Sequence, residues 1–229
     1  MKKILIVGAG KGIGQAIAKK QADTAELWTT SRETEPDLPS RHCHWQASEA
    51  FPEDFLPESL DGLVYCPGTI RLKPFERLSL DDFEEDLDVN LKGAVRVLRA
   101  AMPALKAAPQ ASVVLFSTVA VTTGMPMHAS VASAKGAVEG LTRSLAAEYA
   151  PKIRFNAIAP SLTDTPLASG LLRTERQREA AAARHPLERI GESAELASLA
   201  SFLLAEDSGW ISGQVLHADG GMSSIMKFA

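Results

Sequence analysis

The chain has 229 residues, of which 45% are hydrophobic, and a formal net charge of −4 at pH 7. This length and composition suit one α/β domain over residues 1–229, because the chain can bury a substantial core and no linker divides it. Its Lys and Arg residues are scattered instead of gathered on one stripe, which argues against a nucleic-acid surface.

The two cysteines, Cys43 and Cys66, are too few for a disulfide framework or a metal knuckle, so we expect reduced thiols and no metal site. The apolar run after Lys2-Lys3 ends at Gly8, which is too short for a membrane span or the body of a signal peptide. We therefore expect a cytoplasmic protein without a membrane partner.

Short apolar runs alternate along the chain with segments of helical periodicity. The predicted strands are 3–8, 26–30, 42–46, 61–66, 111–118, 153–158 and 214–218, and the predicted helices are 12–21, 80–107, 130–149 and 193–204. Strand cores such as Val113-Val114-Leu115 are apolar without alternation, as in parallel strands covered on both faces. The pattern predicts a Rossmann-type, doubly wound parallel sheet with helices on both faces, whose ligands bind beyond the carboxyl ends of the strands.

The first predicted strand runs directly into a glycine-rich turn, residues 8–14, and then into a helix. Glycine lets the backbone turn tightly and approach a ligand, while the first turn of a helix offers free N–H groups to an anion. The turn lacks the G-x-G-x-x-G spacing, and such turns also occur for structural reasons alone. We interpret it as a cradle for a dinucleotide pyrophosphate, formed by Gly8, Lys11, Gly12, Ile13 and Gly14.

The end of the second predicted strand bears on the choice of coenzyme. An NAD site places an acidic residue there for the ribose 2′-hydroxyl, but this chain has Ser31 followed by Arg32. Arg32 and Lys11 can hold a 2′-phosphate through charge-assisted hydrogen bonds. Two solvated surface cations are the alternative, and Glu33 reduces the local positive charge. The residues favour NADP(H) over NAD(H).

Several strand ends, taken together, resemble the short-chain dehydrogenase/reductase family over essentially the whole chain. The motifs that carry the resemblance are Gly8-x-x-x-Gly12-x-Gly14, Asp88-Val89-Asn90-Leu91, the segment Pro160–Thr165 in place of P-G-x-x-x-T, and Asp219-Gly220-Gly221. The stretch between the second and fourth strands is shorter and less typical. No family-like Asp for the adenine follows the third strand, where residues 45–48 read Trp-Gln-Ala-Ser.

The resemblance implies a Tyr-x-x-x-Lys signature on a long helix, a preceding Ser, and an Asn in the middle of another helix. Lys135 is in register and would hold the nicotinamide ribose, whereas Val131 stands where the proton-donating Tyr belongs. Thr118 falls at the Ser position and keeps a hydroxyl that can polarise a carbonyl. The backbone carbonyl of Asn90 would hold a water linked to the lysine.

The missing Tyr hydroxyl is a large loss, since a well-placed general acid contributes about 10²–10⁴ in rate. His128 lies three residues before Val131 and is a competent acid near neutral pH, although a loop histidine is often a solvated or capping group. Ser130 and Ser133 are weaker candidates, and Ser130 is also a candidate helix cap. The only tyrosines, Tyr65 and Tyr149, lie far from the signature in sequence and neither is well placed.

Other residues complete the family pattern. Thr165 resembles the residue that binds the nicotinamide carboxamide, and it is also a candidate cap for the segment that follows. Residues 166–190 lie where the family carries a substrate lid; Arg173 and Arg176 there are either a solvated helix face or contacts for an anionic substrate. Gly140 and Ala146-Ala147 allow close helix packing, consistent with the dimers or tetramers that the resemblance implies.

The sequence therefore predicts an NADP(H)-dependent oxidoreductase acting on a small carbonyl or alcohol, with Asn90, Thr118, Lys135 and either His128 or water handling the proton. A second interpretation is a nucleotide-binding homologue that has lost the reaction and serves as a sensor or partner subunit. A third is a structural assembly protein without nucleotide. Redirected chemistry requires another proton donor near the substrate carbonyl, whereas lost chemistry predicts an apolar pocket.

Overall fold

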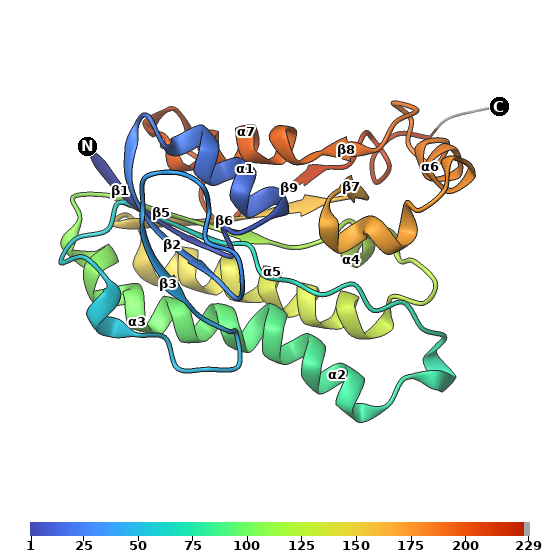
Figure 1. Cartoon of the computed structure of the whole chain (residues 1–229), viewed down its shortest axis with the longest axis horizontal. Helices are drawn as coiled ribbons and strands as arrows, with labels where there is room; N and C mark the ends of the chain where they lie inside the picture. The colour runs from blue at the N-terminus through green and yellow to red at the C-terminus, as the bar shows by residue number, and fades with distance from the viewer. Residues whose placement is uncertain (227–229) are drawn as a thin grey trace.

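The computed structural model describes residues 1–226, and in this part of the chain seven parallel strands form one sheet of order β3-β2-β1-β4-β5-β6-β9 (Figure 1). The strands are β1 (Lys2–Val7), β2 (Ala25–Ser31), β3 (Arg41–His44), β4 (Gly62–Tyr65), β5 (Ala111–Phe116), β6 (Ile153–Pro160) and β9 (Val215–Ala218). The strand order reverses between β1 and β4, where open parallel sheets bind their ligands. The predicted doubly wound architecture is confirmed.

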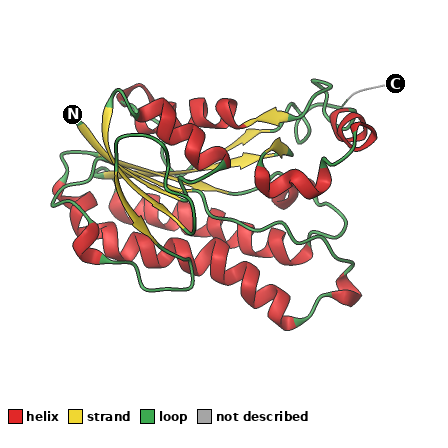
Figure 2. Ribbon diagram, in the orientation of Figure 1, coloured by secondary structure: helices red, strands yellow, loops and turns green. Residues whose placement is uncertain are grey.

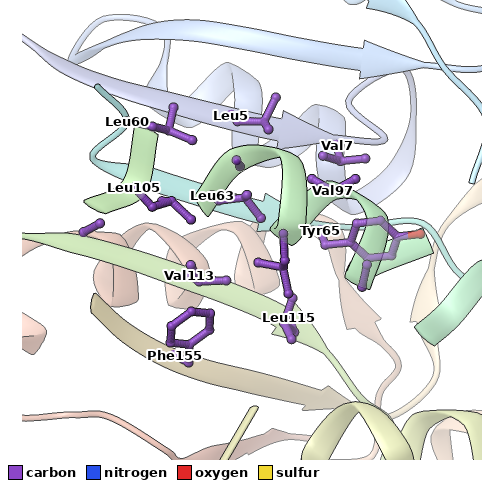
Figure 3. Close-up of a cluster of buried hydrophobic side chains, with 14 of the residues drawn as sticks. Leu5, Val7, Leu60, Leu63, Tyr65, Val97, Leu105, Val113, Leu115 and Phe155 are labelled. Carbon is purple, nitrogen blue, oxygen red and sulfur yellow. The ribbon is translucent and has the colours of Figure 1, made fainter. Parts of the chain in front are cut away.

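Helices cover both faces of the sheet, which explains the uninterrupted apolar runs of its strands (Figure 2). On one face, Ile6 of β1 packs with α1 (Gly12–Gln21) and α7 (Ser193–Leu204). On the other face, Leu5 packs with α3 (Gly93–Ala107) and α5 (Ala129–Tyr149), beside α2 (Leu80–Leu87). Figure 3 shows this second cluster, in which the side chains of β1, β4 and β5 meet Val97 of α3. Successive residues of one strand are thus buried in two separate cores.

The predicted helix over 80–107 is confirmed as helical throughout, and it consists of three parts that the sequence pattern does not separate. A capping box between Ser79 and Asp82 begins α2, and a π-helical segment, Asp88–Lys92, joins α2 to α3. Hydrophobic spacing does not reveal one wider turn inside a long helix. Such π segments occur frequently at functional sites, and this one carries Asn90.

Between β6 and α7, the chain extends away from the sheet before it packs against the sheet again. Two short strands, β7 (Thr163–Asp164) and β8 (Gly191–Glu192), pair with each other at the two ends of this excursion. Between them lie a 3₁₀ segment, Pro166–Leu171, and α6 (Glu175–Ala182), which sit beyond the carboxyl ends of the strands in Figure 1. These elements are absent from the predicted ones, because two-residue strands and a polar eight-residue helix leave little periodicity in the sequence.

Among residues 1–226, no helix is both long enough and apolar enough to cross a membrane. The same residues contain no cluster of three or more His, Cys, Asp or Glu side chains that could hold a metal ion.

Candidate active site

Two cavities lie side by side at the carboxyl edge of the sheet. The first, of about 300 Å³, follows the ends of β1, β2 and β4, and the second, of about 480 Å³, follows β5 and β6 and reaches under α6. Six residues line both cavities: Ile13, Cys66, Gly68, Thr69, Thr165 and Leu167. The cavities therefore meet, and a long ligand in the first can present one end to the second.

The glycine-rich turn is built for close approach of a ligand. Gly8 and Gly12 have φ angles of 83° and 59°, which favour glycine. A Cβ at Gly14 would lie 2.2 Å from the carbonyl oxygen of Gly8, and one at Gly10 would lie 2.3 Å from that of Thr34. Helix α1 then begins at Gly12 without a side-chain cap or an acidic residue in its first turn. Its free N–H groups and positive dipole end fit a pyrophosphate.

The end of β2 offers cations to the same cavity. Lys11 and Arg32 are exposed and both line the first cavity, as the predicted 2′-phosphate contacts require. Glu33 also lines it and adds one negative charge. Ser31, which replaces the expected acidic residue, is buried, and its hydroxyl lies 3.2 Å from Nε2 of His42.

Positions 45–48, where the family resemblance places the adenine contacts, contribute no carboxylate to the first cavity, but an acidic residue from another element lines it. Residues 45–48 line the cavity, with the Trp45 ring buried and its indole N–H donating to Ala50. Asp88 also lines it and pairs with Arg96 at 2.8 Å. In the sequence, Asp88 is recognisable only as part of the motif around Asn90, and no pattern predicts its place at this cavity.

Lys135 and Val131 lie one turn apart on α5, and both line the second cavity. Lys135 is 7% exposed, and its ammonium group donates to the carbonyl oxygen of Phe116 at 2.8 Å. Burial lowers the pKa of Lys135 to about 8. Val131 is 6% exposed and presents only methyl groups, so this wall of the cavity has no proton donor at that position.

Asn90 is buried behind Gly68 and Thr69, which line both cavities, and one of its polar atoms has no partner. Its amide nitrogen donates to the Thr69 hydroxyl at 2.8 Å and to the Asp86 carbonyl oxygen at 2.7 Å, while Oδ1 is buried and unpaired. A Cβ at Gly68 would lie 3.3 Å from that Oδ1 and 3.4 Å from the Lys135 ammonium. An orphaned acceptor and an ammonium group thus converge on a glycine that both cavities share, which fits a ribose-bearing ligand.

Thr118 and Thr165 both have hydroxyl groups and both line the cavities. Thr118 lines the second cavity, and its hydroxyl also accepts from the Ala120 N–H at 3.3 Å. Thr165 lies beside the glycine-rich turn: a Cβ added to Gly12 would be 3.6 Å from the Cβ of Thr165. Its hydroxyl caps the 3₁₀ segment by accepting from Ala168 at 3.2 Å, so the predicted capping role is confirmed.

His128 reaches the second cavity, whereas the neighbouring serines do not. The Nδ1 atom of His128 lies 2.8 Å from the Pro126 carbonyl oxygen, which leaves Nε2 without a partner in the described residues. Ser130 was predicted as a helix cap, and this is wrong: its buried hydroxyl donates to the Asp86 carboxylate at 2.6 Å. Ser133 is exposed on the helix and bonds the Ala129 carbonyl oxygen at 2.7 Å.

Asp86 is a buried carboxylate that the sequence analysis did not single out. It accepts from the Thr69 hydroxyl at 2.5 Å and from Ser130, and the Arg71 guanidinium lies 3.9 Å away. Because Thr69 also accepts from Asn90, this carboxylate connects α2 to the junction of the cavities and to α5. Its negative charge is held by two hydroxyl donors and a nearby cation.

The tyrosine and cysteine side chains at this edge do not supply the missing acid. The buried Tyr65 hydroxyl donates to the Val89 carbonyl oxygen at 2.6 Å, so it is occupied within the helical layer. Burial raises the pKa of the Cys66 thiol to about 12 and that of Cys43 to about 11, which keeps both protonated near neutral pH.

The excursion between β7 and β8 roofs the second cavity and supplies residues that the sequence analysis missed. Arg173 and Arg176 are exposed and do not line the cavity, so the suggested contact with an anionic substrate is wrong; Arg184 lines it instead. Ser161 and His185 also line it and hydrogen-bond each other at 2.8 Å. The one available signal was Ser161 itself, a hydroxyl in place of the Gly of P-G-x-x-x-T.

The sheet order, the glycine cradle at the first strand and the adjoining cavity define a Rossmann-type dinucleotide-binding protein. The sequence pattern described as "Enoyl-(Acyl carrier protein) reductase" matches residues 36–223. The chain belongs to the short-chain dehydrogenase/reductase family, whose members are oxidoreductases that bind NAD(P).

The sequence is similar to those of known dehydrogenases and reductases over nearly its whole length. A tropinone reductase homolog of Arabidopsis thaliana is 32% identical over 96% of this chain and 92% of its own length. Glucose 1-dehydrogenase of Gluconobacter oxydans is 32% identical over 99% and 94%. The ligand-free aldohexose dehydrogenase of Thermoplasma acidophilum superposes with a TM-score of 0.91 at 27% identity, covering 100% of this chain and 96% of its own.

A gluconate 5-dehydrogenase of Burkholderia cenocepacia, solved in complex with NADP and tartrate, superposes with a TM-score of 0.90 at 26% identity, covering 98% of this chain and 96% of its own.

Proposed function

We propose that this chain is an NADP(H)-dependent oxidoreductase that transfers hydride to or from a small carbonyl or alcohol. The observation that carries the proposal is the junction of the two cavities, where the Lys135 ammonium and the unpaired Oδ1 of Asn90 converge on Gly68. A coenzyme held in the first cavity would supply the hydride at this junction, and the second cavity would hold the substrate.

The first cavity would bind the coenzyme through its backbone and two cations. Gly8, Gly12, Ile13 and Gly14 would surround the pyrophosphate at the start of α1. Lys11 and Arg32 would hold the 2′-phosphate, and Thr165 would contact the carboxamide. The NADP bound to the gluconate 5-dehydrogenase neighbour supports the choice of coenzyme.

In the second cavity, the Thr118 hydroxyl would polarise the substrate carbonyl while Lys135 and Asn90 hold the nicotinamide ribose and its water. Two histidines line this cavity, His128 and His185, and an imidazole is a competent acid near neutral pH. The walls are mainly apolar, including Val131, and they suit a substrate whose body is apolar around one carbonyl.

A nucleotide-binding sensor or partner subunit is the rival proposal. It is supported by Val131, which has no proton to donate where the family has a tyrosine.

Titration with NADPH and NADH, followed by nicotinamide fluorescence, tests which coenzyme is bound. We expect Arg32→Ala to weaken NADPH binding by about 10- to 100-fold and to leave NADH unchanged, because a charge-assisted hydrogen bond contributes about 1.5–3 kcal/mol. Arg173→Ala is the control, because Arg173 lies outside both cavities. Equal binding of the two coenzymes would contradict the NADP(H) assignment, and turnover of a carbonyl panel separates the enzyme from the sensor.

We also propose a homo-oligomer, a dimer or tetramer, in the reducing cytoplasm, where Cys43 and Cys66 stay free. Gly140 supports association through α5, because a Cβ there would meet nothing within 4 Å. Ala147 is exposed on the same helix, whereas Ala146 is buried against Gly213 of its own chain. The mass in solution by light scattering, compared with that of Gly140→Arg, tests this interface.

A further inference from the structure

A serine and a buried histidine form a hydrogen-bonded pair in the wall of the second cavity. Ser161 directly follows Pro160, the last residue of β6, and His185 follows α6. The serine Oγ lies 2.8 Å from Nε2 of the imidazole, and His185 is only 3% exposed. The pair lies inside the cavity wall and joins the end of the sheet to the roof.

The contacts of the imidazole decide which nitrogen can exchange a proton. Nδ1 lies 2.9 Å from the Ala181 carbonyl oxygen, and because a carbonyl only accepts, Nδ1 carries a hydrogen. The Nε2 atom is therefore the exchangeable site, and it faces Ser161. In the neutral imidazole the serine donates to Nε2, and in the imidazolium Nε2 donates to the serine.

The serine hydroxyl has a second direction available. Its Oγ also lies 3.2 Å from the Met222 sulfur, a weak acceptor. When Nε2 donates to Ser161, the hydroxyl hydrogen is free to turn to another acceptor in the cavity. A substrate oxygen is a far stronger acceptor than a thioether.

Ser161 and Thr118 lie on neighbouring strand ends. Beyond the paired residues Phe116 and Ile158, the N–H of Val119 continues the ladder by donating to the Pro160 carbonyl oxygen at 3.0 Å. Thr118 thus lies beside Pro160, and adjacent strands are about 4.8 Å apart. Both hydroxyls line the same cavity, so one carbonyl oxygen can lie within reach of both.

We propose that Ser161 donates the proton to the substrate oxygen and that His185 reprotonates Ser161, in place of the tyrosine that Val131 has replaced. The inference rests on the proposed function. As hydride from a reduced nicotinamide reaches the carbonyl carbon, the C=O π pair moves to oxygen and takes the Ser161 hydroxyl proton. The Nε2–H bond of the imidazolium breaks in turn, its proton passes to Ser161, and neutral imidazole remains. Alcohol oxidation runs the same transfers backwards.

Two of the chain's departures from the family motifs, Val131 and Ser161, then compensate for each other. A hydroxyl is lost at position 131, and one is gained at position 161, where the motif has Gly. His185 supplies the ionisable group that a serine lacks. It is a positioning and relay residue, because it acts on the substrate only through Ser161.

The test uses NADPH consumption with a panel of aldehydes, α-diketones and quinones, and it continues with the carbonyl that turns over fastest. We expect Ser161→Gly to lower kcat by about 10²–10⁴-fold, the range of a lost general acid, with NADPH affinity unchanged. Ser161→Thr keeps the hydroxyl and should retain activity, and His185→Gln should approach the Ser161→Gly value. Ser133→Ala is the matched control, because that serine lies outside the cavity.

A rescue separates proton donation from folding. Adding Val131→Tyr to Ser161→Gly should restore kcat, because the tyrosine returns a donor to the same cavity. Two results would overturn the proposal: turnover kept in Ser161→Gly but lost in His128→Ala, or loss in Ser161→Gly without rescue by Val131→Tyr. A wild-type chain that does not bind NADPH, or that binds it and reduces no carbonyl, would instead refute the proposed function itself.

Discussion

The two halves of the carboxyl edge differ in how they are built. The half at the ends of β1, β2 and β4, which we propose for the coenzyme and call the coenzyme half, is formed mainly by backbone: glycines, free N–H groups and a helix start. The half at the ends of β5 and β6, which we propose for the substrate and call the substrate half, is formed by side chains that come together from distant positions, such as Ser161 with His185. Behind its wall, Ser130 donates to Asp86, which also accepts from Thr69 of the cavity lining. Backbone geometry tolerates almost no change at a few positions, whereas side-chain chemistry can be moved from one position to another.

The largest expected effect tests the long-range contacts of the substrate half. We expect Asp86→Ala to lower the free energy of unfolding by about 2–6 kcal/mol, because it leaves the Thr69 and Ser130 hydroxyls without their buried acceptor and each unsatisfied donor costs about 1–3 kcal/mol. Urea denaturation measures the change. Asp81→Ala, an exposed position on the same helix, should alter stability by less than about 0.5 kcal/mol. Equal effects of the two variants would mean that the buried carboxylate contributes nothing specific.

The next effect tests the backbone of the coenzyme half. In Gly14→Ala the new Cβ would meet the Gly8 carbonyl oxygen at 2.2 Å, so we expect a loss of about 1–3 kcal/mol in stability and loss of NADPH binding. Thermal unfolding and fluorescence titration measure the two quantities. An alanine at this position that binds NADPH normally would show that the cradle is not the coenzyme site.

A smaller effect concerns Lys135, which lies at the junction of the halves. Its pKa of about 8, lowered by burial, means that the ammonium predominates below pH 8 and is lost above it. We expect NADPH affinity to fall by about tenfold as the pH rises from 7 to 9, because a charge-assisted hydrogen bond to the ribose is lost. Lys135→Met should bind more weakly at pH 7 and should lack this dependence. The same pH curve in both proteins would exclude Lys135 as its cause.

The same residue gives a stability effect of defined sign. The ordinary pKa of lysine is about 10.4, so between pH 8 and that value the unfolded chain binds more protons than the folded one. The contribution of Lys135 to stability therefore rises with pH across this window. Urea midpoints at pH 7.5 and 9.5, in wild type and Lys135→Met, measure it; a wild-type difference no larger than that of the variant would contradict the buried ammonium.

The smallest expected effect is an increase in stability. Gly136 lies within α5, and a Cβ there would meet only Val121, at an ordinary 3.7 Å. Gly136→Ala should raise the free energy of unfolding by about 0.5–1 kcal/mol, since alanine loses less backbone entropy in a helix. Thermal unfolding provides the measurement, and a loss of stability there would mean that α5 is more tightly packed than its contacts indicate.

The difference between the halves also explains what the sequence could predict. The sheet, its strands and the glycine cradle follow from local patterns, because apolar runs, glycines and helix starts act over a few residues. Asp86 with Ser130 and Ser161 with His185 are separated by 44 and 24 positions, and no local pattern links them. The π segment around Asn90 is local, but the sequence does not reveal it, because one wider turn hardly disturbs the spacing of hydrophobic residues.

The pairing of β7 with β8 has a consequence for how the family diversifies. Thr163 pairs with Gly191 and Asp164 with Glu192. The segment that covers the second cavity therefore begins and ends at the same pair of short strands. Exchanging the intervening residues for a relative's counterpart is thus expected to leave the sheet intact. Substrate preference can then change with these residues while the sheet is kept, provided that Thr165 and His185 are retained.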